Sequence, residues 1–79
     1  MQAAGDRHAE GAAWHNLGNA LRAAGRGQEA VEAYGKSLAV FREFEDFYHE
    51  GLSLSGLAHA HIAVHRPADA RTRAARLQD

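Results

Sequence analysis

The stretch from Trp14 to Tyr34 reads WHNLGNALRAAGRGQEAVEAY, and it decides the fold. Its first half places apolar or small side chains at the spacing of one helix face: Trp14, Leu17, Gly18, Leu21 and Ala24. Asp6 is the expected N-cap, so the spacing predicts a helix over residues 7–24. The segment 25–27, Gly-Arg-Gly, breaks the pattern, and Gly25 suits a left-handed helix end.

Further helices are predicted on both sides of residue 46. The second, residues 28–45, carries an apolar or small stripe: Ala30, Tyr34, Ser37, Leu38, Phe41 and Phe44. Asp46 is expected to cap a third helix over 47–65, with the stripe Leu54, Leu57, Ala58, His61 and Val64. Pro67 fits the first turn of a short fourth helix, residues 67–77, with Ala70, Ala74 and Leu77 on one side.

These patterns predict an all-α fold of two successive antiparallel helix hairpins, four helices in total. No stretch alternates with a period of two residues, so no strand is expected. Shifting the sequence by 40 residues against itself gives 8 identities over 35 pairs, among them Asp6 with Asp46 and Leu17 with Leu57. The chain therefore reads as one domain, residues 1–79, with a first repeat at 7–45 and a second, degenerate or capping repeat at 47–78.

The first hairpin resembles a tetratricopeptide repeat. The family pattern Trp-x2-Leu-Gly-x2-Tyr followed by Ala-x3-Phe reads here Trp14-x2-Leu17-Gly18-x2-Leu21 followed by Ala30-x3-Tyr34. The second hairpin is similar to a degraded copy, Leu54-x2-Leu57-Ala58-x2-His61 and Ala70-x3-Ala74. The 40-residue period resembles a long-repeat subclass found in cell-polarity adaptors and in arrays attached to bacterial regulatory ATPases.

The resemblance implies a protein–protein interaction module that binds a peptide in the groove lined by the first helix of each pair. The expected groove residues are Ala12, His15, Asn19 and Arg22 on the first helix, with Leu52, Ser55, His59 and Ile62 on the third. Asn19 could pair with an extended peptide backbone, and Arg22 with a carboxylate. A clamp for a C-terminal carboxylate is not expected, because only Asn19 matches the residues that such clamps use.

The alternative function is structural self-association without a peptide ligand. Helical repeats bury their faces against neighbours, and about three units are expected for independent stability. The chain is therefore expected to be either a terminal piece of a longer array or a small protein that forms a homodimer. Pairing would cover Phe44, Phe47, Tyr48, Leu52 or Ile62.

Composition argues against several other classes of function. The formal charge of −1 lacks the basic excess of a nucleic-acid module, and the Arg66 to Arg76 segment is expected to be a solvated face. The absence of cysteine, of an apolar span and of a signal sequence favours a cytoplasmic location. No catalytic constellation is present, so neither enzymatic activity nor a cofactor is expected. His61 and His65 could supply two metal ligands, but no third accompanies them, and His61 is expected to pack in the interior.

Overall fold

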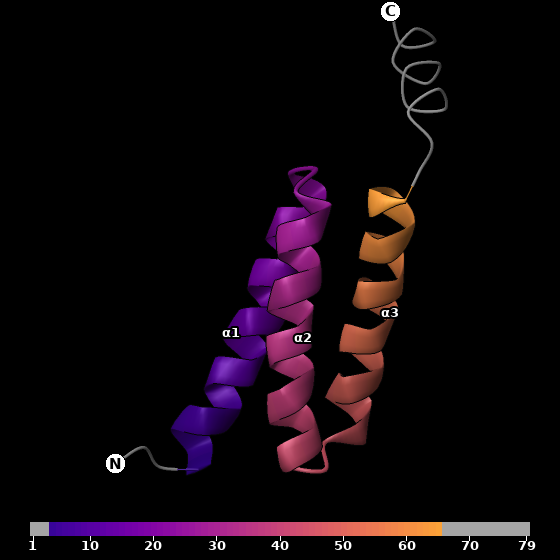
Figure 1. The fold of residues 1–79 in the computed structure, drawn as a ribbon. Coiled ribbons are helices and arrows are strands. Elements are labelled where there is room, and N and C mark those ends of the chain that lie inside the picture. The colour runs from indigo at the N-terminus through magenta and orange to yellow at the C-terminus, as the bar shows by residue number, and fades with distance from the viewer. Residues whose placement is uncertain (1–3, 66–79) are drawn as a thin grey trace, which may run out of the picture.

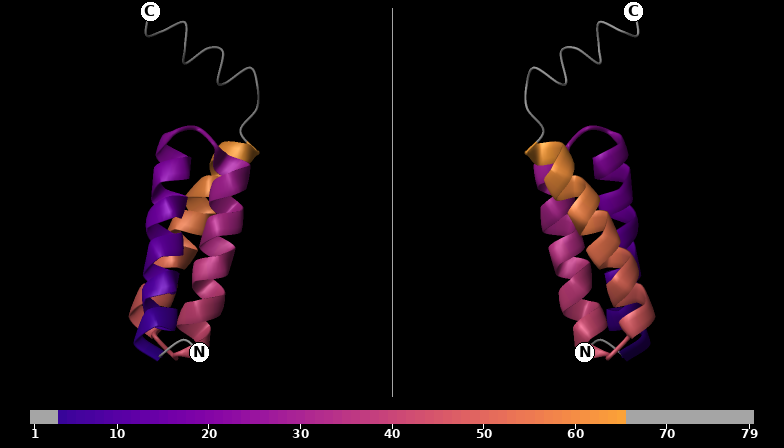
Figure 2. Two further views of the ribbon diagram at one scale, coloured as in Figure 1. Left: turned by 90° about the vertical axis from the view of Figure 1, so that its left-hand side faces the viewer. Right: turned by 90° about the vertical axis from the view of Figure 1, so that its right-hand side faces the viewer.

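Three α-helices lie side by side in the computed structural model, which describes residues 4–65. They are α1 (Ala4–Ala23), α2 (Gly27–Glu43) and α3 (Phe47–Val64). Figure 1 shows α1 and α2 as an antiparallel hairpin, with α3 on the other side of α2 and antiparallel to it. The two views of Figure 2 show that α3 runs obliquely across the α1–α2 hairpin. α2 packs against both neighbours, whereas α1 and α3 touch each other at few positions.

Both connections between helices use the same backbone arrangement. After α1, Gly25 has φ +79° and the Arg26 N–H donates to the Leu21 carbonyl at 2.9 Å. After α2, Glu45 has φ +52° and the Asp46 N–H donates to the Phe41 carbonyl at 2.8 Å. These hydrogen bonds satisfy the last carbonyls of each helix and turn the chain back sharply. The left-handed end at Gly25 is therefore confirmed, while that at Glu45 was not anticipated.

The N-terminus of α3 begins where the sequence predicts. The Asp46 carboxylate accepts a hydrogen bond from the His49 N–H at 3.1 Å, which satisfies one of the free donors of the first turn. Such a cap contributes about 1 kcal/mol to stability. The expected cap at Asp6 is wrong, because α1 starts at Ala4 and Asp6 lies inside its first turn, where its negative charge still favours the helix.

The core is built around Tyr34, whose ring lies between glycines of the two neighbouring helices. Tyr34 is 0% exposed. A β-carbon built on Gly18 of α1 would stand 2.8 Å from the ring, and one built on Gly56 of α3 would stand 2.6 Å from it. Ala30 and Ala60 complete this cluster, with Leu21, Val31 and Leu57 at its edge. Small side chains at these sites let three helix backbones converge on one aromatic ring.

The prediction of four helices in two hairpins is wrong, because residues 4–65 form one hairpin and a third helix. The all-α class itself is confirmed. The predicted fourth helix, residues 67–77, lies outside the described residues.

Two of the expected apolar stripes also need correction. In α1, Gly18 is buried but Leu17 is 43% exposed. In α3 the buried positions are Ser53, Gly56 and Ala60, whereas Leu54 is 42% exposed. Ala58 and His61 are exposed as well, so the expectation that His61 packs in the interior is wrong. The stripe of α2 is confirmed from Ala30 to Phe41, and Phe44 is half-buried.

Candidate functional site

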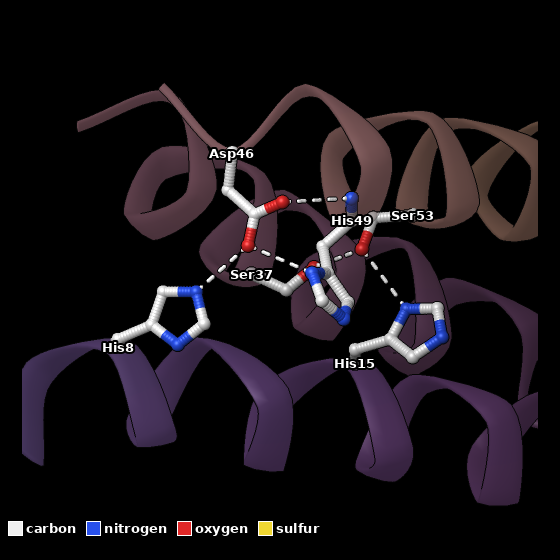
Figure 3. Close-up of polar contacts among 6 residues, drawn as sticks. All are labelled: His8, His15, Ser37, Asp46, His49 and Ser53. Carbon is white, nitrogen blue, oxygen red and sulfur yellow. Dashed lines mark hydrogen bonds and ion pairs between the residues drawn. The ribbon is translucent and has the colours of Figure 1, made fainter. Parts of the chain in front are cut away.

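Polar side chains gather where α1 faces α3. Figure 3 shows His8 and His15 projecting from α1 toward Asp46, His49 and Ser53, with Ser37 of α2 beside them. His8 and His15 are seven residues apart, so they lie on one face of α1, two turns apart. The contacts divide into a hydrogen-bonded chain around His15 and a cluster around Asp46.

The chain around His15 begins and ends on Tyr34. The Tyr34 hydroxyl donates to Asn19 Oδ1, and Asn19 Nδ2 lies 3.3 Å from His15 Nε2. His15 Nδ1 lies 2.9 Å from Ser53 Oγ, which is 2.9 Å from Ser37 Oγ. Ser37 Oγ in turn donates to the Tyr34 carbonyl at 2.8 Å. No buried polar side-chain atom within the described residues is left without a partner.

This chain fixes the protonation state of His15. An amide nitrogen can only donate, so His15 Nε2 must accept from Asn19 and the ring proton must sit on Nδ1, directed at Ser53. Because the Ser37 hydroxyl hydrogen points to a carbonyl, the bond between the two serines is donated by Ser53. The pKa of His15 is lowered, first by burial and then by repulsion from His49 and Arg22. The neutral imidazole is therefore part of the folded structure.

The stability of the fold should depend on pH through His15. Because its folded-state pKa lies below the usual 6.5, the unfolded chain binds more protons in that window. This contribution is complete above 6.5 and is lost as the pH falls toward the folded-state pKa. We expect urea unfolding at about pH 7.5 and about pH 5.5 to show this decline for the wild type, and a smaller decline for His15→Gln.

The exposed His59 supplies the matched control for that measurement. His59→Gln removes one histidine without touching the chain of hydrogen bonds between the helices. A decline that is the same in His15→Gln as in the wild type would contradict the assignment.

The second cluster centres on Asp46, whose two carboxylate oxygens have separate partners. Oδ1 accepts the capping bond from the His49 backbone, while Oδ2 lies 2.8 Å from His8 Nε2 and 2.7 Å from His49 Nδ1. The hydrogen bond from His8, followed by the one from the His49 backbone, lowers the pKa of Asp46 from 3.8 to about 2. A carboxylate that stays charged thus joins α1 to the start of α3.

The groove residues expected from the sequence fall into two groups. Ala12 of α1 is exposed, and so are all four expected residues of α3: Leu52, Ser55, His59 and Ile62. His59 Nδ1 donates to the Ser55 carbonyl at 2.9 Å. The remaining three, all on α1, are half-buried: His15, Asn19 and Arg22. The structure thus brings His15 and Asn19 together with α3 through Ser53, rather than leaving them free in solvent.

The residues expected to support self-association lie mainly on the outside of α3. Phe47 is 75% exposed, Tyr48 72%, Ile62 67% and Leu52 42%. Phe44 of α2 is different, because it is half-buried and its ring centroid lies 5.4 Å from that of His8.

Sequence reasoning missed several members of both clusters. The apolar spacing of α2 places Ser37 in a packing stripe, and no sequence pattern marks Ser53, yet both are 0% exposed and hydrogen-bonded. His8 and His49 are 41 positions apart, and only the arrangement of α1 beside α3 brings both to Asp46. A usable signal was the helical spacing of His8 and His15, on the same face as Asn19.

Comparison with known proteins assigns the family. A family model described as tetratricopeptide repeat matches residues 9–78. No curated protein and no solved structure matches the chain significantly. None of the three helices in residues 4–65 combines the length and apolar character needed to cross a bilayer. A match over residues 9–78, together with helices packed as a hairpin and a third helix, shows that the chain belongs to the tetratricopeptide-repeat family.

Proposed function

We propose that the chain binds an extended peptide segment of a partner protein along the face shared by α1 and α3. Tetratricopeptide repeats are generally non-enzymatic modules for protein–protein interaction, and the family match supports that class of function. The membership in a long-repeat subclass and the position of the groove remain predictions. The observation that carries the proposal is the arrangement of Asn19, which is held in place yet keeps hydrogen-bonding capacity.

Asn19 is oriented by two interactions with its own chain. Its oxygen accepts from Tyr34 and its nitrogen faces His15, which leaves one N–H and one lone pair free. A free donor and a free acceptor on one amide match the alternating groups of an extended peptide backbone. Because the amide is already fixed, little side-chain entropy would be lost on binding, and such preorganisation favours affinity.

Arg22 supplies the charge on this face. It lies one turn beyond Asn19 on α1, is half-buried, and forms no ion pair with another residue of the described chain. Guanidinium groups bind carboxylates through paired hydrogen bonds. A peptide with an acidic side chain near its contact with Asn19 is therefore the favoured ligand class.

Binding should depend on Arg22 but not on a comparable arginine elsewhere. Peptides selected from a displayed random library are expected to carry an acidic residue. They should bind Arg22→Ala at least about tenfold more weakly than the wild type, since a hydrogen bond to a charged group contributes about 1.5–3 kcal/mol. Arg42→Ala is the matched control, because Arg42 is exposed on α2 and its contact with Glu50 is long, at 3.5 Å. Equal losses in both variants would contradict the proposal.

A second candidate, self-association, is favoured by the exposed apolar side chains of α3. Phe47 and Tyr48 stand next to each other and are about three-quarters exposed. Burial of apolar surface favours association by roughly 25 cal/mol per Å² before the entropic cost of binding.

Sedimentation and peptide binding, measured on two variants, separate the two functions. Phe47→Ser with Tyr48→Ser should dissociate a homodimer and leave peptide binding intact, and Arg22→Ala should do the opposite.

A further inference from the structure

We propose that His8, Asp46 and His49 together bind one divalent transition-metal ion of the zinc class. Each residue offers one ligand atom, and these atoms all lie within 4.8 Å of one another. Among residues 4–65 this is the only group of three histidines or carboxylates that converges in this way. A zinc ion about 2.0–2.1 Å from each ligand would place the ligand atoms about 3.3 Å apart. The two pairs that include Asp46 Oδ2, now 2.8 and 2.7 Å apart, would lengthen by about 0.5 Å, and the two imidazole nitrogens, within 4.8 Å of each other, would approach by about 1.5 Å or less.

The two oxygens of the Asp46 carboxylate have separate roles, and one of them is available as a metal ligand. Oδ1 is used by the helix cap, whereas Oδ2 points at both imidazoles, at 2.8 Å from His8 Nε2 and 2.7 Å from His49 Nδ1. A metal ion between the three side chains would replace the hydrogens that the two rings now direct at Oδ2. Asp46 would bind it through Oδ2 alone and would keep the N-cap of α3.

Aromatic contacts hold both imidazoles in position. The His8 ring packs edge-on against Phe41, with centroids 5.6 Å apart, and also against Phe44. The His49 ring stacks on Phe41 at 5.2 Å. In each ring the nitrogen away from Asp46 can carry the proton, so a neutral imidazole can present a lone pair to the ion without losing a proton overall.

The composition of the cluster selects the class of ion. Two imidazole nitrogens and one carboxylate oxygen suit zinc, cobalt, nickel or copper, whereas calcium and magnesium require oxygen ligands. Three protein ligands leave a fourth tetrahedral position for water. The bound ion would link α1 to the first turn of α3, two helices with few mutual contacts, and binding to the folded state alone raises stability.

A second pair of histidines provides the matched control. His61 and His65 are four residues apart at the end of α3, with ring centroids 6.1 Å apart and parallel rings. Both are exposed, and no carboxylate or third histidine of the described chain completes a set with them. Two exposed histidines one turn apart represent the adventitious binding from which the proposed site must be distinguished.

The experiment titrates the untagged full chain with zinc chloride by calorimetry, with cobalt absorption as a second readout of ligand geometry. We expect one ion per chain, at least about tenfold weaker binding in His8→Ala, His49→Ala and Asp46→Asn, and unchanged binding in the double variant His61→Ala/His65→Ala. Asp46→Asn keeps a capping side chain, so its loss of affinity is not a loss of fold. Zinc should raise the melting temperature of the wild type and of the double variant, but not of His8→Ala. Binding that survives His8→Ala, or that disappears in the double variant, would overturn the proposal.

Discussion

Replacement of Tyr34 by alanine is expected to leave the chain largely unfolded at 25 °C. Tyr34 is fully buried, its ring fills the space between Gly18 and Gly56, and its hydroxyl and carbonyl are the two ends of the hydrogen-bonded chain through His15. Removing a buried aromatic ring costs about 3–5 kcal/mol. Domains of this size stand near the low end of the usual range of about 5–15 kcal/mol, so a loss of that size is comparable to the whole stability.

Thermal melting followed by far-ultraviolet circular dichroism tests this expectation. Tyr48→Ala is the matched control, because the same ring is removed from a position that is 72% exposed, where the cost should be about 0.5 kcal/mol or less. Tyr34→Phe separates the ring from the hydroxyl, since it keeps the packing and loses one hydrogen bond, at a cost of about 1 kcal/mol. A cooperative transition in Tyr34→Ala within a few degrees of the wild type would show that the ring is not the centre of the core.

The sequence predicts the first turn, the stripe of α2 and the start of α3 well, because the signals for these features are local. The break at residues 25–27, the stripe of α2 and the cap at Asp46 each depend on neighbours within one or two helical turns. The break after Phe44 carries no glycine, and Glu45 takes the left-handed conformation there. Non-glycine residues adopt this conformation rarely, so no composition signal marks the second turn.

The error on α3 has a geometric cause. Its predicted stripe was the counterpart, by the 40-residue shift, of the α1 face that packs on α2. In the structure α3 meets α2 with another face, formed by Ser53, Gly56 and Ala60. Their counterparts on α1 are Ala13, Asn16 and Ala20, which are exposed. A helix in such a repeat packs one face on its hairpin partner and another face on the preceding helix. A single apolar stripe in the sequence does not indicate which of these two faces it forms.

The candidate site was also predictable only in part, because the sequence does not show which helix faces meet in the fold. The family resemblance directs attention to His15, Asn19 and Arg22, all of which lie on one side of α1. It gives no information on whether a polar side chain is free or is used inside the fold. Asn19 forms hydrogen bonds with Tyr34 and His15 inside the fold. Only its remaining N–H and lone pair are available to a ligand. Which hydrogen bonds are internal depends on contacts between residues 38 apart, such as His15 with Ser53.

Replacement of Gly56 by alanine is expected to destabilise the chain, although alanine favours helices over glycine by about 1 kcal/mol. The new β-carbon would lie 2.6 Å from the Tyr34 ring, so either the ring or α3 must move. The ring cannot move away freely, because it also lies close to Gly18 of α1, where a built β-carbon would be 2.8 Å from it, and Asn19 holds the hydroxyl. Overpacking of this kind costs about 1–3 kcal/mol, which outweighs the gain in helix propensity.

Gly35→Ala is the matched control for that reasoning, because alanine at this position should stabilise the chain rather than destabilise it. Gly35 lies inside α2, is exposed, and has no atom within 4 Å of the place where a β-carbon would stand. Gly35→Ala should therefore raise stability by about 0.5–1 kcal/mol, or the melting temperature by a few degrees. Urea unfolding of both variants measures the difference. If Gly56→Ala were stabilised as much as Gly35→Ala, the close approach of α3 to Tyr34 would be wrong, and with it the packing that places Ser53 and His49 opposite α1.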